Sequence, residues 1–297
     1  MDKPSCPSLR TPFLSLEPIQ KRIAEILRNR RSAKSFVGGS SVFNATFPRI
    51  SDDIDIYVED IAIAAIAEAD LKALDAAGLQ IKSRQDHYGF AIEAVISDGQ
   101  SDTNLEWNEA DRHRFFPIQK DRIFGWSLHR ADLSVQKLVA AASRRAVRDI
   151  VDVGLINERY MPLAAIALAA PAKMPGISPT GILERVRQIA MGHTEEDYKA
   201  LRLDADVDLP PLGQFKLGIS DTIQTAIDVI TDRCWKAEPG HLYIDKTTGK
   251  ITIPVNESLD RMAKQAASEK GTVPFLGRSR ETVQPPAKQR GKDGPGR

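Results

Sequence analysis

The stretch Val37–Val58, VGGSSVFNATFPRISDDIDIYV, decides the fold. It opens with a Gly-Gly-Ser turn at 38–40 after a short apolar strand, continues through an apolar segment with helical spacing, and ends in a strand. Side chains two residues apart on a strand point the same way, so Ser51, Asp53 and Asp55 share one face. The isoleucines between and after the aspartates take the opposite face, where they can enter a hydrophobic core.

The paired aspartates and the preceding glycines indicate one kind of site. Like charges side by side on a strand repel each other, and a divalent cation removes that cost. Mg²⁺ in particular prefers a few carboxylates together with substrate phosphates. Glycines let backbone N–H groups approach a phosphate, and a helix N-terminus favours negative charge. A half-exposed strand whose acids face water is the alternative, but the order and spacing of both features favour a phosphate and metal site.

The same stretch resembles motif I of the nucleotidyltransferases of the AbiEii/AbiGii toxin family, within the DNA polymerase β-like superfamily. That family's pattern is Gly-Gly-Ser or Gly-Gly-Thr, followed by Arg-x-Ser-x-Asp-Ile-Asp. The resemblance implies that the two aspartates bind metal and act in catalysis, and that the remaining positions bind nucleotide. The positions that match are Gly38, Gly39, Ser40, Arg49, Ser51, Asp53 and Asp55.

A second block surrounds Glu106, which lies on a short predicted strand before Arg114-Phe115-Phe116-Pro117. In the resembled family a strand of the form Leu-Asp-Trp or Ile-Asp-Phe stands here, followed by Arg-Phe-Phe-Pro, and its acid supplies the third catalytic, metal-binding carboxylate. The resemblance therefore assigns that role to Glu106, with one methylene more than the usual Asp. Asp102 and Glu109 are alternative third acids, and a lone glutamate on a strand is usually solvated.

A third block lies at 130–157, where the pattern predicts two helices. The family has Asp-Leu-Ala-x-x-Lys, then Arg, then Arg-Asp-x-x-Asp. The resemblance implies that Lys137 is a catalytic residue that binds nucleotide phosphates, and that Asp149 and Asp152 belong to the nucleotide-binding set as groups that border or order the site. Without the resemblance, helix caps and charge pairs on an exposed face would explain these residues. The matching residues are Asp132, Lys137, Arg145, Arg148, Asp149 and Asp152.

Composition narrows the class of protein. The chain of 297 residues has 42% hydrophobic and 27% charged residues, which fits a globular protein. A net charge of +1 neither favours nor excludes a nucleic-acid partner. Cys6 and Cys234 are too isolated to indicate a disulfide framework or a zinc site. No signal peptide is apparent and the apolar stretches are too short for a bilayer, so we expect a cytoplasmic protein with no membrane partner.

The order of elements predicts an α+β fold: a small mixed β-sheet nucleotidyltransferase core with packed helices, followed by a mainly helical C-terminal domain. We expect the core at 1–130, the helical domain that completes the site at 131–270, and a disordered tail at 271–297. Proline residues predict an irregular lead-in at 1–15. The predicted strands are 34–37, 79–83, 88–96 and 103–107 with a hairpin at 242–253, and the predicted helices are 17–31, 61–77, 161–170, 177–191, 195–201 and 217–235.

Together these blocks predict an Mg²⁺-dependent nucleotidyltransferase that moves a nucleoside monophosphate from an NTP to an acceptor hydroxyl. Two metal ions would be held by Asp53, Asp55 and Glu106. The resemblance implies a toxin of a bacterial toxin–antitoxin or phage-defence system, an RNA acceptor such as a tRNA 3′ end, and an antitoxin encoded nearby. The alternatives are a non-catalytic nucleotide-binding module of the same fold and a small-molecule nucleotidyltransferase of antibiotic-modifying type.

Overall fold

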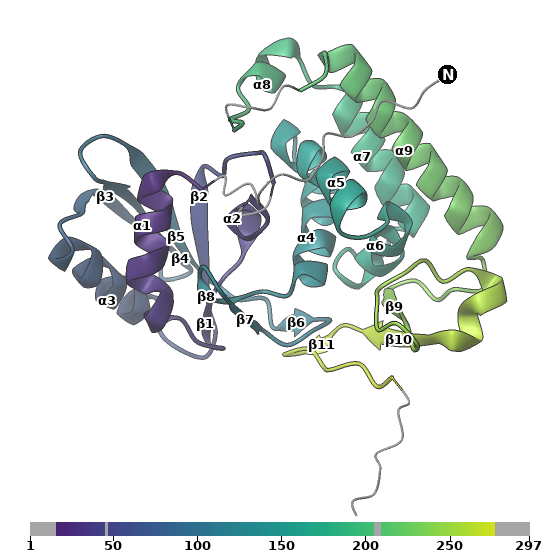
Figure 1. Ribbon diagram of the computed structural model, residues 1–297, viewed down its shortest axis with the longest axis horizontal. Helices are drawn as coiled ribbons and strands as arrows, with labels where there is room; N and C mark the ends of the chain where they lie inside the picture. The colour runs from purple at the N-terminus through teal and green to yellow at the C-terminus, as the bar shows by residue number, and fades with distance from the viewer. Residues whose placement is uncertain (1–15, 45–46, 205–208, 277–297) are drawn as a thin grey trace, which may run out of the picture.

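The computed structural model describes residues 16–44, 47–204 and 209–276. Its first part is built on a seven-stranded mixed sheet with the strand order β3-β4-β5-β2-β1-β8-β7 (Figure 1). β2 is parallel to β5 and antiparallel to β1, and β4 is antiparallel to both β3 and β5. The strands are β1 (Ser35–Val37), β2 (Asp53–Val58), β3 (Gln80–His87), β4 (Ala91–Ser97), β5 (Asp102–Glu109), β7 (Gln119–Asp121) and β8 (Gly125–Ser127).

Two helices, α1 (Pro18–Leu27) and α3 (Ile63–Ala76), pack on one face of this sheet. Alternate residues of β2, beginning at Ile54, are buried on that face, as the strand pattern predicts. α1 begins with a proline at its first position and a capping box between Glu17 and Gln20. At its other end, the predicted helix at 17–31 stops as an α-helix at Leu27 and continues as a 3₁₀ turn, η1 (Arg28–Arg30).

The rest of the chain is mainly helical. α2 (Gly39–Asn44) lies between β2 and α4, and the later helices follow α4 away from the sheet (Figure 1). Within the described ranges, none of the helices is both long enough and apolar enough to cross a membrane. These helices are α4 (Arg130–Ser143), α5 (Val147–Arg159), α6 (Leu163–Ala169), α7 (Pro179–Met191), α8 (Glu195–Lys199) and α9 (Leu212–Arg233), with a 3₁₀ turn η2 (Ala170–Ala172).

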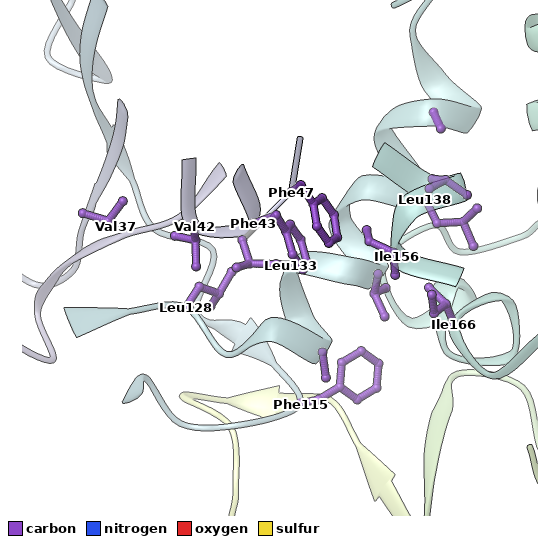
Figure 2. Close-up of a cluster of buried hydrophobic side chains, with 14 of the residues drawn as sticks. Val37, Val42, Phe43, Phe47, Phe115, Leu128, Leu133, Leu138, Ile156 and Ile166 are labelled. Atoms are coloured by element: carbon purple, nitrogen blue, oxygen red, sulfur yellow. The ribbon is translucent and has the colours of Figure 1, made fainter. Parts of the chain in front are cut away.

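One hydrophobic cluster joins the sheet to the helices. Figure 2 shows Phe43 and Phe47, from α2 and the segment after it, close to Leu133 of α4, with Ile156 of α5 beyond them. The aromatic rings of Phe43 and Phe47 stack with centroids 5.3 Å apart. The α+β class is confirmed, whereas the boundary between a core at 1–130 and a domain at 131–270 stays a prediction.

The C-terminal strands differ from the predicted hairpin at 242–253. A turn does form, because Thr252 N donates to Tyr243 O at 2.9 Å, but the returning segment makes a single bridge between Ile244 and Ile251. The following Pro254 has no N–H with which to continue a ladder. The principal partner of β9 (His241–Asp245) is β10 (Met262–Ala266), reached through the 3₁₀ turn η3 (Asn256–Arg261). β11 (Ser268–Glu269) pairs with β6 (His113–Arg114).

Other helix and strand boundaries differ from the predicted ones for local reasons. The predicted strands 79–83 and 88–96 are one hairpin of β3 and β4, and Tyr88 and Phe90 lie in its loop. α9 begins directly after Pro211, five positions before the predicted start at 217. At the start of the predicted tail, Thr272 N donates to Phe115 O at 3.2 Å, so this end is hydrogen-bonded to the fold. The rest of that tail, 277–297, and the predicted lead-in, 1–15, lie outside the described residues.

Candidate functional site

A cleft of about 330 Å³ lies between the open face of β2 and β5 and the helix α4. Its two sides carry opposite charges. Asp53, Asp55 and Glu106 line the side formed by the sheet, which we call the sheet wall. Lys137 and Arg144 line the opposite side, which we call the helix wall. All three blocks of the sequence, far apart along the chain, therefore contribute to one site.

The parallel pairing of β2 with β5 assembles the carboxylates of the sheet wall. Asp55 is the register partner of Glu106, and Asp53 is the partner of Asn104. One carboxylate oxygen from each of Asp53, Asp55 and Glu106 lies within 4.8 Å of the others. Of the three candidate third acids, the structure brings Glu106 to the aspartates. Asp102 instead accepts from Lys82 at 2.8 Å.

Burial makes this group of carboxylates costly to ionise. Desolvation raises the pKa of Asp55 to about 7, and the nearby charges of Asp53 and Glu106 add to that shift. Desolvation also raises the pKa of Glu106, again with a contribution from Asp53. Ser51 Oγ donates to Asp53 Oδ1 at 3.1 Å, which holds that carboxylate in place. Hard oxygen donors with too little positive charge around them are the ligands that a divalent cation stabilises.

The two glycines at the start of the site are needed for close packing. Gly39 has a φ of +65°, and a Cβ there would lie 1.6 Å from Asp55 Oδ2. A Cβ on Gly38 would lie 2.5 Å from the ring of Tyr57. The glycines therefore let the chain turn directly against the acidic face of β2. Tyr57 also lines the cleft, although no role in the site was predicted for it. Its position two residues after Asp55, on the same strand face, is the signal in the sequence that would have predicted this.

Buried ion pairs fix the helix wall from behind. Lys137 Nζ donates to Ser40 Oγ at 2.5 Å and to Asp149 Oδ1 at 3.1 Å, and it lies 3.2 Å from Asp152 Oδ2. Arg49 Nε and Nη2 donate to the two oxygens of Asp152 at 2.7 and 2.8 Å. The structure thus brings together Ser40, Arg49 and Lys137 from three separate segments of the chain through two aspartates.

Asp149 and Asp152 are fully buried and lie behind the residues that line the cleft. Burial alone would raise the pKa of each carboxyl, but the neighbouring cations outweigh it and the pKa of both is lowered. The alternative interpretation, charge pairs on an exposed helix face, is wrong, because the side chain of Lys137 is only 8% exposed. Neither aspartate is among the residues that line the cleft, and each contacts a cation that does.

Two arginines that line the cleft come from the junction between α4 and α5. Arg144 Nε and Nη2 donate to Asp149 at 2.6 and 3.0 Å, and Arg148 Nη1 donates to Asp52 Oδ2 at 2.8 Å. The family pattern matched Arg145, but its guanidinium donates to Gly192 O at 3.1 Å, and it is not among the residues that line the cleft. Arg144 caps α4 with an extended backbone, φ −131° and ψ 153°, so adjacent side chains diverge there.

Asp132, another residue of the third block, has a structural role. Its carboxylate accepts from the backbone N–H of Phe115 at 2.7 Å and of Phe116 at 3.0 Å. This contact attaches the Arg-Phe-Phe-Pro segment of the second block to the first turn of α4. This contact joins the second and third blocks, and none of its three residues lines the cleft.

Comparison with known proteins places the fold. No protein-family model matches the sequence, and no curated protein sequence matches it. Among solved structures, the chain is similar to MenT4, a nucleotidyltransferase toxin from Mycobacterium tuberculosis H37Rv, with a TM-score of 0.51. The two are 12% identical, over 71% of this chain and 82% of that chain. The likeness confirms a nucleotidyltransferase-like fold, while membership of the AbiEii/AbiGii family stays a prediction.

Proposed function

We propose that this chain is an Mg²⁺-dependent nucleotidyltransferase that transfers a nucleoside monophosphate from an NTP to an acceptor hydroxyl. One observation carries the proposal: three carboxylates with oxygens within 4.8 Å of one another face a wall of cations across one cleft. The similarity of the fold to MenT4, which is named a nucleotidyltransferase toxin, supports it.

In this proposal the residues of the sheet wall would hold two divalent cations. Asp53, Asp55 and Glu106 offer hard oxygen donors, and Asp55 and Glu106 are made basic by burial and by their neighbours. Bound Mg²⁺ would lower the pKa of the attacking hydroxyl and neutralise charge on the triphosphate. Ser51 keeps Asp53 oriented for that role through its hydrogen bond.

The remaining predicted residues would bind the nucleotide. Gly39 and Ser40 of the glycine turn and the guanidinium of Arg49 line the cleft with Lys137, and Gly38 precedes them. In this proposal Lys137 stabilises charge on the leaving pyrophosphate, because a preorganised cation in a desolvated site lowers the energy of that charge. Asp149 and Asp152 do not touch the nucleotide. They position Lys137 and Arg49, to which they are hydrogen-bonded.

We further propose that the acceptor is RNA, with a tRNA 3′ end as the first candidate, and that the protein acts as a toxin paired with an antitoxin encoded nearby. These finer statements rest on the resemblance of three sequence blocks to the AbiEii/AbiGii family and on the word toxin in the name of MenT4. The second candidate function is a non-catalytic nucleotide-binding module. It is favoured by one observation, the glutamate at 106 where the family has aspartate.

Incubation with each labelled NTP and total RNA, with and without Mg²⁺, tests the proposal. We expect transfer of label to RNA that needs Mg²⁺ and is absent in the Asp55→Ala variant. Label in a small molecule but not in RNA would support the antibiotic-modifying alternative. NTP binding without transfer to any acceptor would support the non-catalytic module.

A further inference from the structure

The cationic side chains beside the cleft differ in how many of their N–H groups already donate hydrogen bonds within the protein. The ammonium of Lys137 has three N–H groups, and it has three oxygen neighbours, on Ser40, Asp149 and Asp152. Arg49 is occupied on Nε, Nη2 and Nη1, the last by the carbonyl of Ile50 at 3.0 Å. A phosphate can bind Lys137 only by exchanging or sharing a bond that the folded protein already makes.

Arg144 is different. One edge of its guanidinium, Nε and Nη2, is bound to Asp149, and within the described part of the chain no residue accepts from Nη1. Its side chain is 53% exposed and lines the cleft, whereas that of Lys137 is 8% exposed. The bidentate pair with Asp149 fixes the plane of the guanidinium, so less side-chain entropy is lost when a ligand binds.

Arg144 also lies within electrostatic reach of the opposite wall. The charges of Asp53 and Asp55 favour the charged form of Arg144, in addition to the larger effect of its hydrogen bond to Asp149 on its pKa. Reciprocally, Arg144 counteracts part of the rise in the pKa of Asp55. A group held between Arg144 and the carboxylates would meet a cation on one side and metal-binding oxygens on the other.

We propose that Arg144 binds the triphosphate of the NTP through the free hydrogens of its guanidinium, while Asp149 holds the guanidinium in place. This inference rests on the proposed function, and it adds a phosphate contact at Arg144, the neighbour of the Arg145 that matched the family pattern. Phosphate oxygens suit a guanidinium because several N–H donors meet them in one plane. Arg144 makes this contact without breaking a bond of the folded protein, unlike Lys137.

Titration calorimetry of the full chain with inorganic tripolyphosphate and Mg²⁺ tests the inference, because this probe has no base whose identity must be known. We expect Arg144→Gln to weaken binding by roughly ten- to a hundredfold, the range for loss of a charged hydrogen bond. Arg145→Gln is the matched control, since it removes the adjacent arginine that contacts Gly192, and it should bind like the wild type. Melting temperatures verify that each variant is folded.

The Arg144→Lys variant separates phosphate binding from a purely structural role. It keeps the charge near the cleft but loses the bidentate pair with Asp149, so tripolyphosphate affinity should lie between those of the wild type and Arg144→Gln. Wild-type affinity in Arg144→Gln would overturn the inference. So would equally weak binding in Arg144→Lys and Arg144→Gln with equally lowered melting temperatures, because Arg144 would then act only through Asp149. A wild-type chain that binds neither tripolyphosphate nor any NTP would overturn the proposed function itself, and this inference with it.

Discussion

On the sheet wall of the cleft, Asp53, Asp55 and Glu106 lie within 4.8 Å of one another, and they form no ion pair within the described residues. On and behind the helix wall, each buried charge has a partner of opposite sign. Lys137 lies between Asp149 and Asp152, and Arg49 is paired with Asp152. The pKa of Asp55 is accordingly raised, while the pKa values of Asp149 and Asp152 are lowered.

The difference separates two kinds of functional residue. Ion pairs on the helix wall are complete in the free protein, so they contribute to a preformed shape and their loss leaves an uncompensated buried charge. Carboxylates on the sheet wall repel one another, and the proposed cation would remove that repulsion, so each one opposes the stability of the protein without bound metal. Substitutions on the two walls should therefore change activity in the same direction but stability in opposite directions.

The largest expected effect is on the sheet wall. Asp53→Ala and Asp55→Ala should each reduce nucleotidyl transfer by about a thousandfold or more, the upper range for loss of a preorganised charge-stabilising group. The free energy of unfolding in EDTA should be unchanged or higher, because a repulsive charge is removed. Labelled-NTP transfer and thermal denaturation measure the two effects. Near wild-type transfer in either variant would show that the cation site lies elsewhere.

The second largest effect on transfer is expected for substitutions of Glu106. Glu106→Gln should lower transfer by roughly a hundredfold or more, because a neutral amide cannot replace an anionic metal ligand. Glu106→Asp should preserve or raise activity, since it keeps the charge and restores the side chain found in the resembled family. Asp102→Ala, on the same strand but paired with Lys82, is the control. Equal turnover in the wild type and Glu106→Gln would remove the third carboxylate from the mechanism.

Substitution of Lys137 tests the helix wall. Lys137→Ala should reduce turnover by about a hundredfold. Because Asp149 and Asp152 would each lose a buried partner, the free energy of unfolding should fall by about 3 kcal/mol, the lower end of the range for a broken buried pair. An exposed helix lysine would change stability by less than about 0.5 kcal/mol. A variant with normal stability and normal turnover would contradict the paired arrangement of this wall.

The smallest expected effect, expressed per pH unit, is in the pH dependence of cation binding. Because the pKa of Asp55 is about 7, a cation must displace a proton at lower pH. Affinity for Mn²⁺, measured by calorimetry, should rise up to about tenfold per pH unit from about pH 5 to about pH 7 and then level off.

The stability of the metal-free protein should show the reverse trend. The folded pKa of Asp55 lies above its ordinary value of 3.8, so the folded state binds a proton that the unfolded state does not between these values. The free energy of unfolding should therefore fall as the pH rises from 3.8 towards 7. Asp55→Asn should remove this part of the dependence, and an identical pH profile in that variant would assign the titration to another group.

Parts of the site could be predicted from the sequence because they depend on local geometry. The alternation of a strand places Asp53, Asp55 and Tyr57 on one face without knowledge of any other segment. Glu106 could be predicted only through the resemblance, since its position opposite Asp55 depends on the parallel pairing of β2 with β5. Strands as short as β6 and β11 could not be predicted, because two residues carry no periodic pattern.

The sequence alone determined the α+β class, the acidic face of β2 and the glycine turn before it, because periods of two and 3.6 residues and turn propensities act over short distances along the chain. Tertiary structure alone decided which charges are paired and which lie open to the cleft. It buried Lys137 between Asp149 and Asp152, and at the end of α4 it directed Arg144 to the cleft and Arg145 to Gly192. The strength of a charge–charge contact depends on distance and burial, and both are set by elements that lie far apart in the sequence.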